Sequence, residues 1–143
     1  MTYAPLDIFS FAHWLYETKP TVPSSSLIRT IINRSYYAAL ISARDFTGSQ
    51  TSGKNGHKQV VDALKEIDPI AANDLNVLRL CRHKADYNLN CKLTSRDAQL
   101  SLVNSRKVLY VSGSRLPHGI PYSYDFLDKS KFINPEEKAP LGT

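Results

Sequence analysis

The feature that most constrains the fold is an apolar stripe at helical spacing with an arginine at its centre. At about 100° per residue on an α-helix, one narrow face collects Ala71, Leu75, Leu78, Arg82, Ala85 and Leu89. This periodicity predicts a helix that begins near residue 69 and packs along that face. A guanidinium on a buried face needs a carboxylate, a phosphate or several carbonyl groups. The nearest carboxylate is that of Asp86, four residues after Arg82.

A polar ridge lies beside this stripe and consists of Arg79, His83 and Tyr87, which follow one another at intervals of four residues. Residues at this spacing share one side of a helix. A guanidinium binds phosphate through paired hydrogen bonds, and an imidazole exchanges protons near neutral pH. The ridge therefore predicts an anion-binding or proton-transferring site, and a solvated helix edge is the alternative.

Apolar residues at helical spacing predict further helices, so we expect ranges of about 5–18, 24–46, 57–67, 69–87 and 95–112. On their core faces we place Phe46 and Ile67, whereas Arg96, Arg106 and Lys107 are expected to face outward. Four or five antiparallel helices joined by short connections predict an all-α, up-and-down bundle.

A second arginine, Arg34, lies in the wide apolar arc of the segment 24–46, which we expect to be the central helix. Two buried guanidinium groups repel unless anions or carboxylates lie between them. One interpretation is a structural network in which Asp45, Asp86 and backbone carbonyls satisfy both Arg34 and Arg82. The other is a site in which the two arginines bind the phosphate of a nucleotide.

The C-terminal sequence differs from the rest because it has no helical period. It contains four prolines and several aromatic residues, namely Pro117, Pro121, Pro135, Pro140, Tyr122, Tyr124 and Phe126. We therefore expect a helical domain over residues 1–115 and an irregular extension over residues 116–143.

The composition, with 22% charged and 42% hydrophobic residues, is typical of a soluble globular chain. No apolar run approaches the roughly 20 residues of a membrane span, and the N-terminus lacks the pattern of a signal peptide, so a cytoplasmic location is expected. Cys81 and Cys91 have neither the spacing of a metal site nor a helical separation that permits a disulfide. We expect no metal and no cofactor.

The net charge of +5 is concentrated in one part of the chain. Eight basic and two acidic residues lie between Arg79 and Arg115, an excess of six positive charges, whereas the remaining residues have an excess of one negative charge. A basic half predicts an acidic partner, above all nucleic acid. A solvated basic face without a ligand is the alternative.

Three segments together carry a family resemblance: RSYYAALISAR from Arg34, HKQVVDAL from His57 and LRLCRHKADY from Leu78. In this order they resemble the HEPN family of small helical bundles. The resemblance implies a dimeric bundle whose active members are metal-independent ribonucleases, many of them toxins or phage-defence effectors. Active members carry an arginine followed after four to six residues by a histidine. In this chain three residues separate Arg79 from His83, and the segment from Arg82 to Tyr87 resembles the R-x-x-A-D-Y branch.

The leading hypothesis is thus a homodimer that acts on RNA through Arg79, His83 and Tyr87, in a toxin–antitoxin or defence setting with a cognate protein partner. A non-catalytic adaptor is the alternative, and in it Arg34, Arg82 and Asp86 are polar groups of the core. A nucleotide-binding module is the second alternative. The sequence leaves enzyme and adaptor both open.

Overall fold

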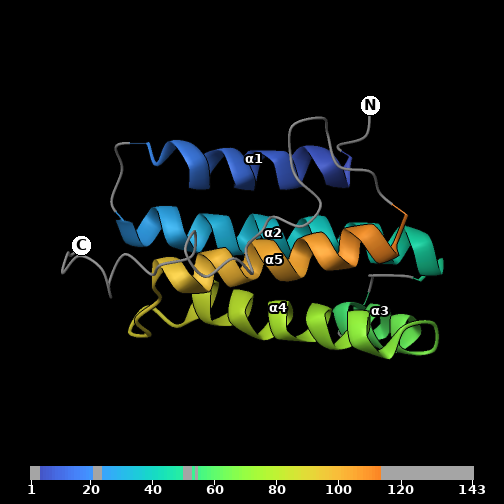
Figure 1. Cartoon of the computed structure of the whole chain (residues 1–143). Coiled ribbons are helices and arrows are strands. Elements are labelled where there is room, and N and C mark those ends of the chain that lie inside the picture. Colours follow the sequence, from blue (N-terminus) through green and yellow to red (C-terminus); the bar gives the residue numbers. More distant parts are fainter. Residues whose placement is uncertain (1–3, 21–23, 50–52, 54, 114–143) are drawn as a thin grey trace.

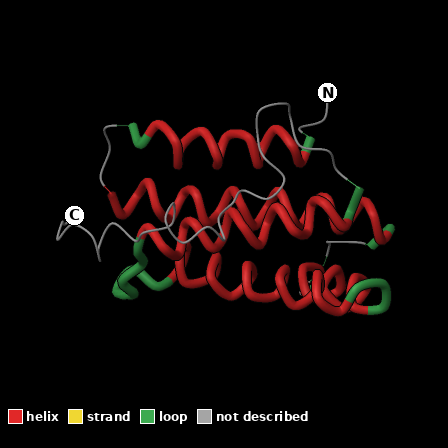
Figure 2. Tube along the Cα trace, in the orientation of Figure 1, coloured by secondary structure: helices red, strands yellow, loops and turns green. Residues whose placement is uncertain are grey.

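The computed structural model describes residues 4–20, 24–49, 53 and 55–113, and all the regular secondary structure in these residues is α-helical. The five helices are α1 (Pro5–Thr18), α2 (Ser24–Thr47), α3 (Gly56–Lys65), α4 (Pro69–Tyr87) and α5 (Ser95–Val111) (Figure 1). Figure 2 shows helices and loops and no strand in the described part of the chain. The expectation of an all-α bundle is confirmed, whereas the predicted extension over residues 116–143 lies outside the described residues.

The helices form a small bundle with α2 at its centre. α2 contacts each of the other four helices, and α5 packs against α1, α2 and α4. In Figure 1, α1 lies on one side of the pair formed by α2 and α5, and α4 with α3 lies on the other. The wide apolar arc of α2 is therefore explained by its neighbours. No helix of the described residues has the length and apolar character needed to cross a bilayer.

The helix ends follow the local chemistry of the sequence. Asp68 caps α4, because its side chain accepts hydrogen bonds from the backbone N–H groups of Ile70 at 3.1 Å and Ala71 at 3.0 Å. Thr94 and Asp97 form a reciprocal capping box at the start of α5. These two caps fix where α4 and α5 begin, as the sequence predicted.

One apolar cluster joins α2, α3, α4 and the later part of α5, and a second joins α1, α2 and α5. Three residues expected in the core are instead exposed: Phe46 at 43%, Ile67 at 54% and Leu89 at 78%. Phe46 occupies the last turn of α2, whereas Ile67 follows the end of α3 and Leu89 follows the end of α4. The predictions that these three residues are buried were wrong. An apolar stripe predicts burial only where neighbouring helices cover it, and these residues lie at or beyond the helix ends.

The outward orientation predicted for Arg106 was also wrong, since this residue is only 8% exposed. α5 is covered by α1, α2 and α4, and so it buries a wider arc than its apolar stripe indicates. Lys107 and Arg96 are exposed, as expected.

A long-range clamp holds the end of α4 against α2. The guanidinium of Arg29 on α2 donates to four backbone carbonyl oxygens, those of Lys84 at 3.3 Å, Ala85 at 2.9 Å, Asn88 at 3.2 Å and Cys91 at 2.7 Å. The last carbonyls of a helix lack partners within the helix. Arg29 therefore satisfies the C-terminus of α4 and fixes its position beside α2.

Candidate functional site

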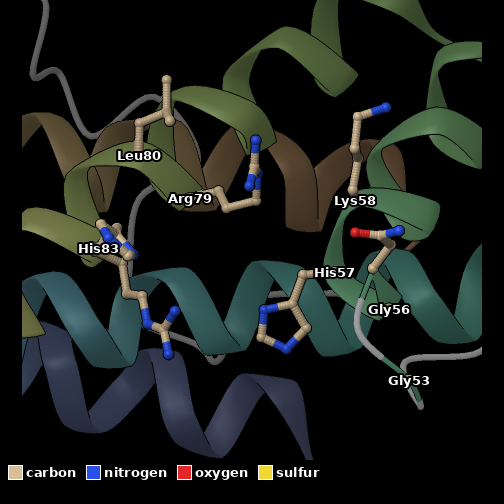
Figure 3. A pocket seen from close by; sticks show the side chains of 9 residues that line it. Gly53, Gly56, His57, Lys58, Arg79, Leu80 and His83 are labelled. Atoms are coloured by element: carbon tan, nitrogen blue, oxygen red, sulfur yellow. The ribbon is translucent and has the colours of Figure 1, made fainter.

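A cavity of about 470 Å³ opens between the start of α3 and the middle of α4 (Figure 3). Its lining consists of Gly53, Asn55, Gly56, His57, Lys58, Arg79, Leu80, Arg82 and His83. The volume lies within the range of about 300–1,000 Å³ that is usual for ligand sites. Two segments far apart in the sequence thus meet at one hollow.

The lining is cationic. It contains Lys58, Arg79 and Arg82 with the imidazoles of His57 and His83, and none of its nine residues is acidic. The first residues of α3 also lie here, and the N-terminal end of a helix carries a partial positive charge. Asn55, at the N-cap of α3, makes no side-chain hydrogen bond to the helix. The cavity therefore favours an anion.

The structure brings together two of the three residues of the predicted ridge. Arg79 and His83 project from α4 at the cavity (Figure 3), and Arg79 Nε donates to Asn76 Oδ1 at 3.1 Å. Tyr87 is 65% exposed and is not part of the lining. Its ring packs against that of His83, with 4.9 Å between centroids and 50° between planes. Tyr87 therefore supports His83 from one turn further along the helix.

Arg82 is held mainly by protein groups. Its Nε lies 2.9 Å from Oδ2 of Asp86, and its terminal nitrogen donates to the hydroxyl of Tyr37 at 2.8 Å. Among the described residues, the Nε–H of Arg82 has no hydrogen-bond partner despite this short distance, so charge rather than an aligned bond joins it to Asp86. The guanidinium carbon also lies 5.2–5.6 Å from the ring centroids of Tyr36, Tyr37 and Tyr87.

Asparagine connects Arg34 to this pair. Asn33 donates through Nδ2 to both carboxylate oxygens of Asp86, at 3.2 and 2.9 Å, and its Oδ1 accepts from Arg34 Nε at 2.8 Å. The guanidinium carbon of Arg34 lies 5.5 Å from the ring centroid of Tyr37. Both arginines therefore contact the same aromatic ring, and Asp86 neutralises part of their charge.

The predicted role of Asp45 in this network was wrong. Asp45 pairs with its neighbour Arg44, whose terminal nitrogen lies 2.9 Å from Oδ1, and its side chain is 59% exposed. It lies near the end of α2, just over three turns after Arg34. The carboxylate of Asp86 comes instead from α4, which packs beside the middle of α2.

The site residue that sequence reasoning missed is His57, in the first turn of α3. Its Nδ1 lies 2.9 Å from the hydroxyl of Tyr36, a residue with 0% exposure. Partial burial, together with the positive charges of Arg82 and Arg79, lowers the pKa of His57 below its ordinary value. Burial raises the pKa of the Tyr36 phenol well above its ordinary value. The sequence marked His57 by its position at a helix start and as the first residue of one of the three resembling segments, but it gave His57 no role in the site, because the contact with Tyr36 spans two helices.

Comparisons of the chain with models of protein families, with curated proteins and with solved structures found no match.

Proposed function

We propose that this chain binds the RNA backbone in the cavity between α3 and α4 and cleaves it as a metal-independent endoribonuclease. The observation that supports this proposal is the meeting of Arg79, His83, His57 and Lys58 around one hollow, with no acidic residue among the described residues of its lining. Phosphodiesters are anions, and the reaction requires proton transfer. The resemblance to HEPN ribonucleases points to the same substrate.

The proposed reaction is an attack of the ribose 2′-oxygen on the adjacent phosphorus. His83 takes the proton from the 2′-hydroxyl, a bond forms between the 2′-oxygen and phosphorus, and the bond from phosphorus to the 5′-oxygen breaks. The imidazolium that results returns its proton to the 5′-oxygen. The products are a 2′,3′-cyclic phosphate and a 5′-hydroxyl, and the protons balance.

In this proposal Arg79 binds the phosphate and stabilises the additional negative charge of the transition state. Lys58 contributes further positive charge at the edge of the cavity, although it is also paired with Asp62 at 3.1 Å. Tyr87 acts through its ring contact with His83. Arg34, Arg82 and Asp86 keep α2 and α4 in register.

Cleavage of a fluorescently labelled single-stranded RNA in excess chelator tests the proposal. We expect the parent protein to cleave it, and His83→Ala and Arg79→Ala to lower the rate by about 100-fold or more. Arg96→Ala is the matched control, because Arg96 is exposed on α5 outside the cavity and its loss removes the same charge. Absence of cleavage by the parent, or equal cleavage by His83→Ala, would refute the nuclease.

A second candidate function is that of a non-catalytic adaptor, and a separate surface favours it. A groove of about 320 Å³ between α4 and α5 has a largely apolar lining, in which Val77 and Leu100 are each 45% exposed and Leu80 is 51% exposed. Exposed apolar groups gathered in a groove are typical of protein interfaces. Under this proposal the chain forms a homodimer or binds a cognate partner through the groove.

Sedimentation of the purified chain tests the adaptor proposal. Val77→Asp and Leu100→Asp place a charge in the groove and are expected to convert a dimer into a monomer. A parent chain that sediments as a monomer at all concentrations would contradict self-association through this groove. The toxin–antitoxin or defence setting is proposed from the family resemblance alone.

A further inference from the structure

The contact between Tyr36 and His57 determines which ring nitrogen of the histidine carries the proton. Tyr36 is fully buried, and the partner of its hydroxyl among the described residues is His57 Nδ1, at 2.9 Å. A phenol both donates and accepts, whereas a neutral imidazole donates through one nitrogen and accepts through the other. The hydrogen between Tyr36 and His57 can therefore belong to either residue.

In the first arrangement, the hydroxyl of Tyr36 donates to Nδ1 of His57, and every polar atom of the contact is satisfied. In the second, Nδ1–H donates to the phenol oxygen. The hydroxyl hydrogen of Tyr36 then remains inside the protein without an acceptor among the described groups. The fold loses the free energy of hydrating this donor and gains no hydrogen bond in return. The first arrangement is therefore favoured, and it places the imidazole proton on Nε2.

A doubly protonated imidazole is disfavoured at this position. The groups that face His57 are the phenols of Tyr36 and Tyr37 on α2 and the guanidinium groups of Arg79 and Arg82 on α4. A proton on Nδ1 would meet the donor hydrogen of Tyr36, and the positive ring would face two arginines. Both effects keep His57 neutral, in agreement with its lowered pKa.

We infer that His57 is a phosphate-binding residue, a neutral hydrogen-bond donor that presents Nε2–H to a non-bridging oxygen of the RNA backbone while Tyr36 holds its tautomer. This inference rests on the proposed function for the identity of the ligand. His57 and His83 line the same cavity from opposite helices (Figure 3). They would then have different tasks, because His57 binds the phosphate and His83 moves the proton.

A neutral donor suits this task. Nε2–H adds no charge beside Arg79 and Arg82, yet it supplies a hydrogen bond to a phosphate oxygen of the bound RNA. The donor is oriented before the substrate arrives, because the bond to Tyr36 fixes the opposite side of the ring. Tyr36 is accordingly a positioning residue, since it acts through His57.

The first test measures the tautomer directly and needs no RNA. In a long-range proton–nitrogen correlation spectrum of the full chain labelled with ¹⁵N-histidine, a protonated and an unprotonated ring nitrogen have well-separated nitrogen shifts. We expect His57 at neutral pH to show Nε2 protonated and Nδ1 unprotonated. Tyr36→Phe removes the donor and should shift the His57 signals towards a mixture of tautomers. A His57 ring with its proton on Nδ1 in the parent protein would overturn the inference.

The second test uses the shape of the replacement side chain. His57→Gln keeps an N–H donor near the position of Nε2, whereas His57→Ala removes it. We expect His57→Ala to raise the KM for RNA about tenfold or more, and His57→Gln to recover most of that loss with kcat close to that of the parent. If His57→Gln lowers kcat as strongly as His83→Ala does, then His57 transfers protons and the inference is wrong.

Titration with inorganic phosphate separates this inference from the proposed function. If the parent fails to cleave RNA, the nuclease proposal fails, but a shift of the His57 Nε2–H signal on addition of phosphate still supports anion binding by this residue. That shift should be absent in Arg79→Ala if the two groups share the anion. No response of His57 to either phosphate or RNA would overturn the inference.

Discussion

The guanidinium of Arg82 donates to the hydroxyl of Tyr37 at 2.8 Å, and this hydrogen bond joins α4 to the central helix α2. The same guanidinium faces Asp86 on its own helix. Because Arg82 also lines the cavity, the bond fixes the position of the α4 segment that carries Arg79 and His83. The geometry of the candidate site thus depends on a polar contact inside the bundle.

Loss of Arg82 is therefore expected to lower the stability of the fold. The side chains of Arg82 and Asp86 are 14% and 24% exposed, and Arg82→Ala would leave the carboxylate of Asp86 with Asn33 as its remaining partner. We expect a loss of about 2 kcal/mol, below the 3–5 kcal/mol typical of a fully buried pair, and a fall in Tm of roughly 8 °C or more. Thermal unfolding followed by circular dichroism measures this.

The matched control for that prediction replaces both charges together. Arg82→Met combined with Asp86→Leu removes the pair without leaving a buried charge, so the double variant should unfold at a higher temperature than Arg82→Ala. Equal Tm values for Arg82→Ala and the parent would show that the pair contributes nothing to stability.

Removal of the Arg29 clamp is expected to loosen the end of α4. Arg29→Ala removes one donor from each of four carbonyl oxygens, of which those of Lys84 and Asn88 keep a backbone N–H partner. We expect the free energy of unfolding to fall by about 2 kcal/mol. Amide hydrogen exchange should accelerate most in the last turn of α4 and in the residues that follow it. Arg29→Lys should recover only part of the protection, because a single ammonium nitrogen replaces the two terminal nitrogens of the guanidinium that donate to these carbonyls. Unchanged exchange in this segment would contradict the clamp.

The lowered pKa of His57 predicts that acid destabilises the fold. In the unfolded chain the imidazole of His57 becomes doubly protonated at about pH 6.5. In the folded protein this protonation requires a lower pH. Between these two values the unfolded state binds more protons, so stability falls as the pH decreases. The pKa of His13 is lowered too and acts in the same direction.

His57→Gln isolates the contribution of His57 to this pH dependence. The variant retains His13, and so the fall in Tm between pH 7.5 and pH 5.5 should become smaller but should not vanish. A variant whose Tm falls as steeply as that of the parent would show that His57 does not titrate as the geometry requires.

Binding of RNA is expected to depend on Arg79 and on salt. In the binding assay, the RNA carries 2′-deoxy positions that prevent cleavage. We expect Arg79→Ala to raise the Kd about tenfold or more. The slope of log affinity against log salt concentration should also become shallower by about one, which corresponds to the loss of one phosphate contact. Arg96→Ala should leave both unchanged. Fluorescence anisotropy measures both the Kd and its salt dependence. An identical salt slope for Arg79→Ala and the parent would show that Arg79 does not bind an RNA phosphate.

Local sequence chemistry predicted much of the fold, including the start of α4 at the Asp68 cap and the ion pair of Arg82 with Asp86. These features depend on residues only a few positions apart. The contact of Tyr36 with His57 and the clamp of Arg29 on α4 could not be predicted. They depend on how far each helix is rotated and shifted against α2, and the pattern of a single helix does not contain that information.

The same reason explains the errors at Arg106 and Asp45. Arg106 is buried because α5 has neighbours on three sides, and Asp45 is too far along α2 to reach Arg34. Within the candidate site, Arg79 and His83 were predicted from their spacing. The second imidazole, that of His57, could be assigned to the site only from the packing of α3 beside α4.

The most direct measurement is the chemical identity of the RNA ends that the parent protein produces in excess chelator, determined by mass spectrometry. Attack by the 2′-oxygen with His83 as the proton carrier predicts a 2′,3′-cyclic phosphate and a 5′-hydroxyl, and no cleavage at a 2′-deoxy position. A 3′-hydroxyl with a 5′-phosphate, or intact RNA after prolonged incubation, would contradict the proposed reaction.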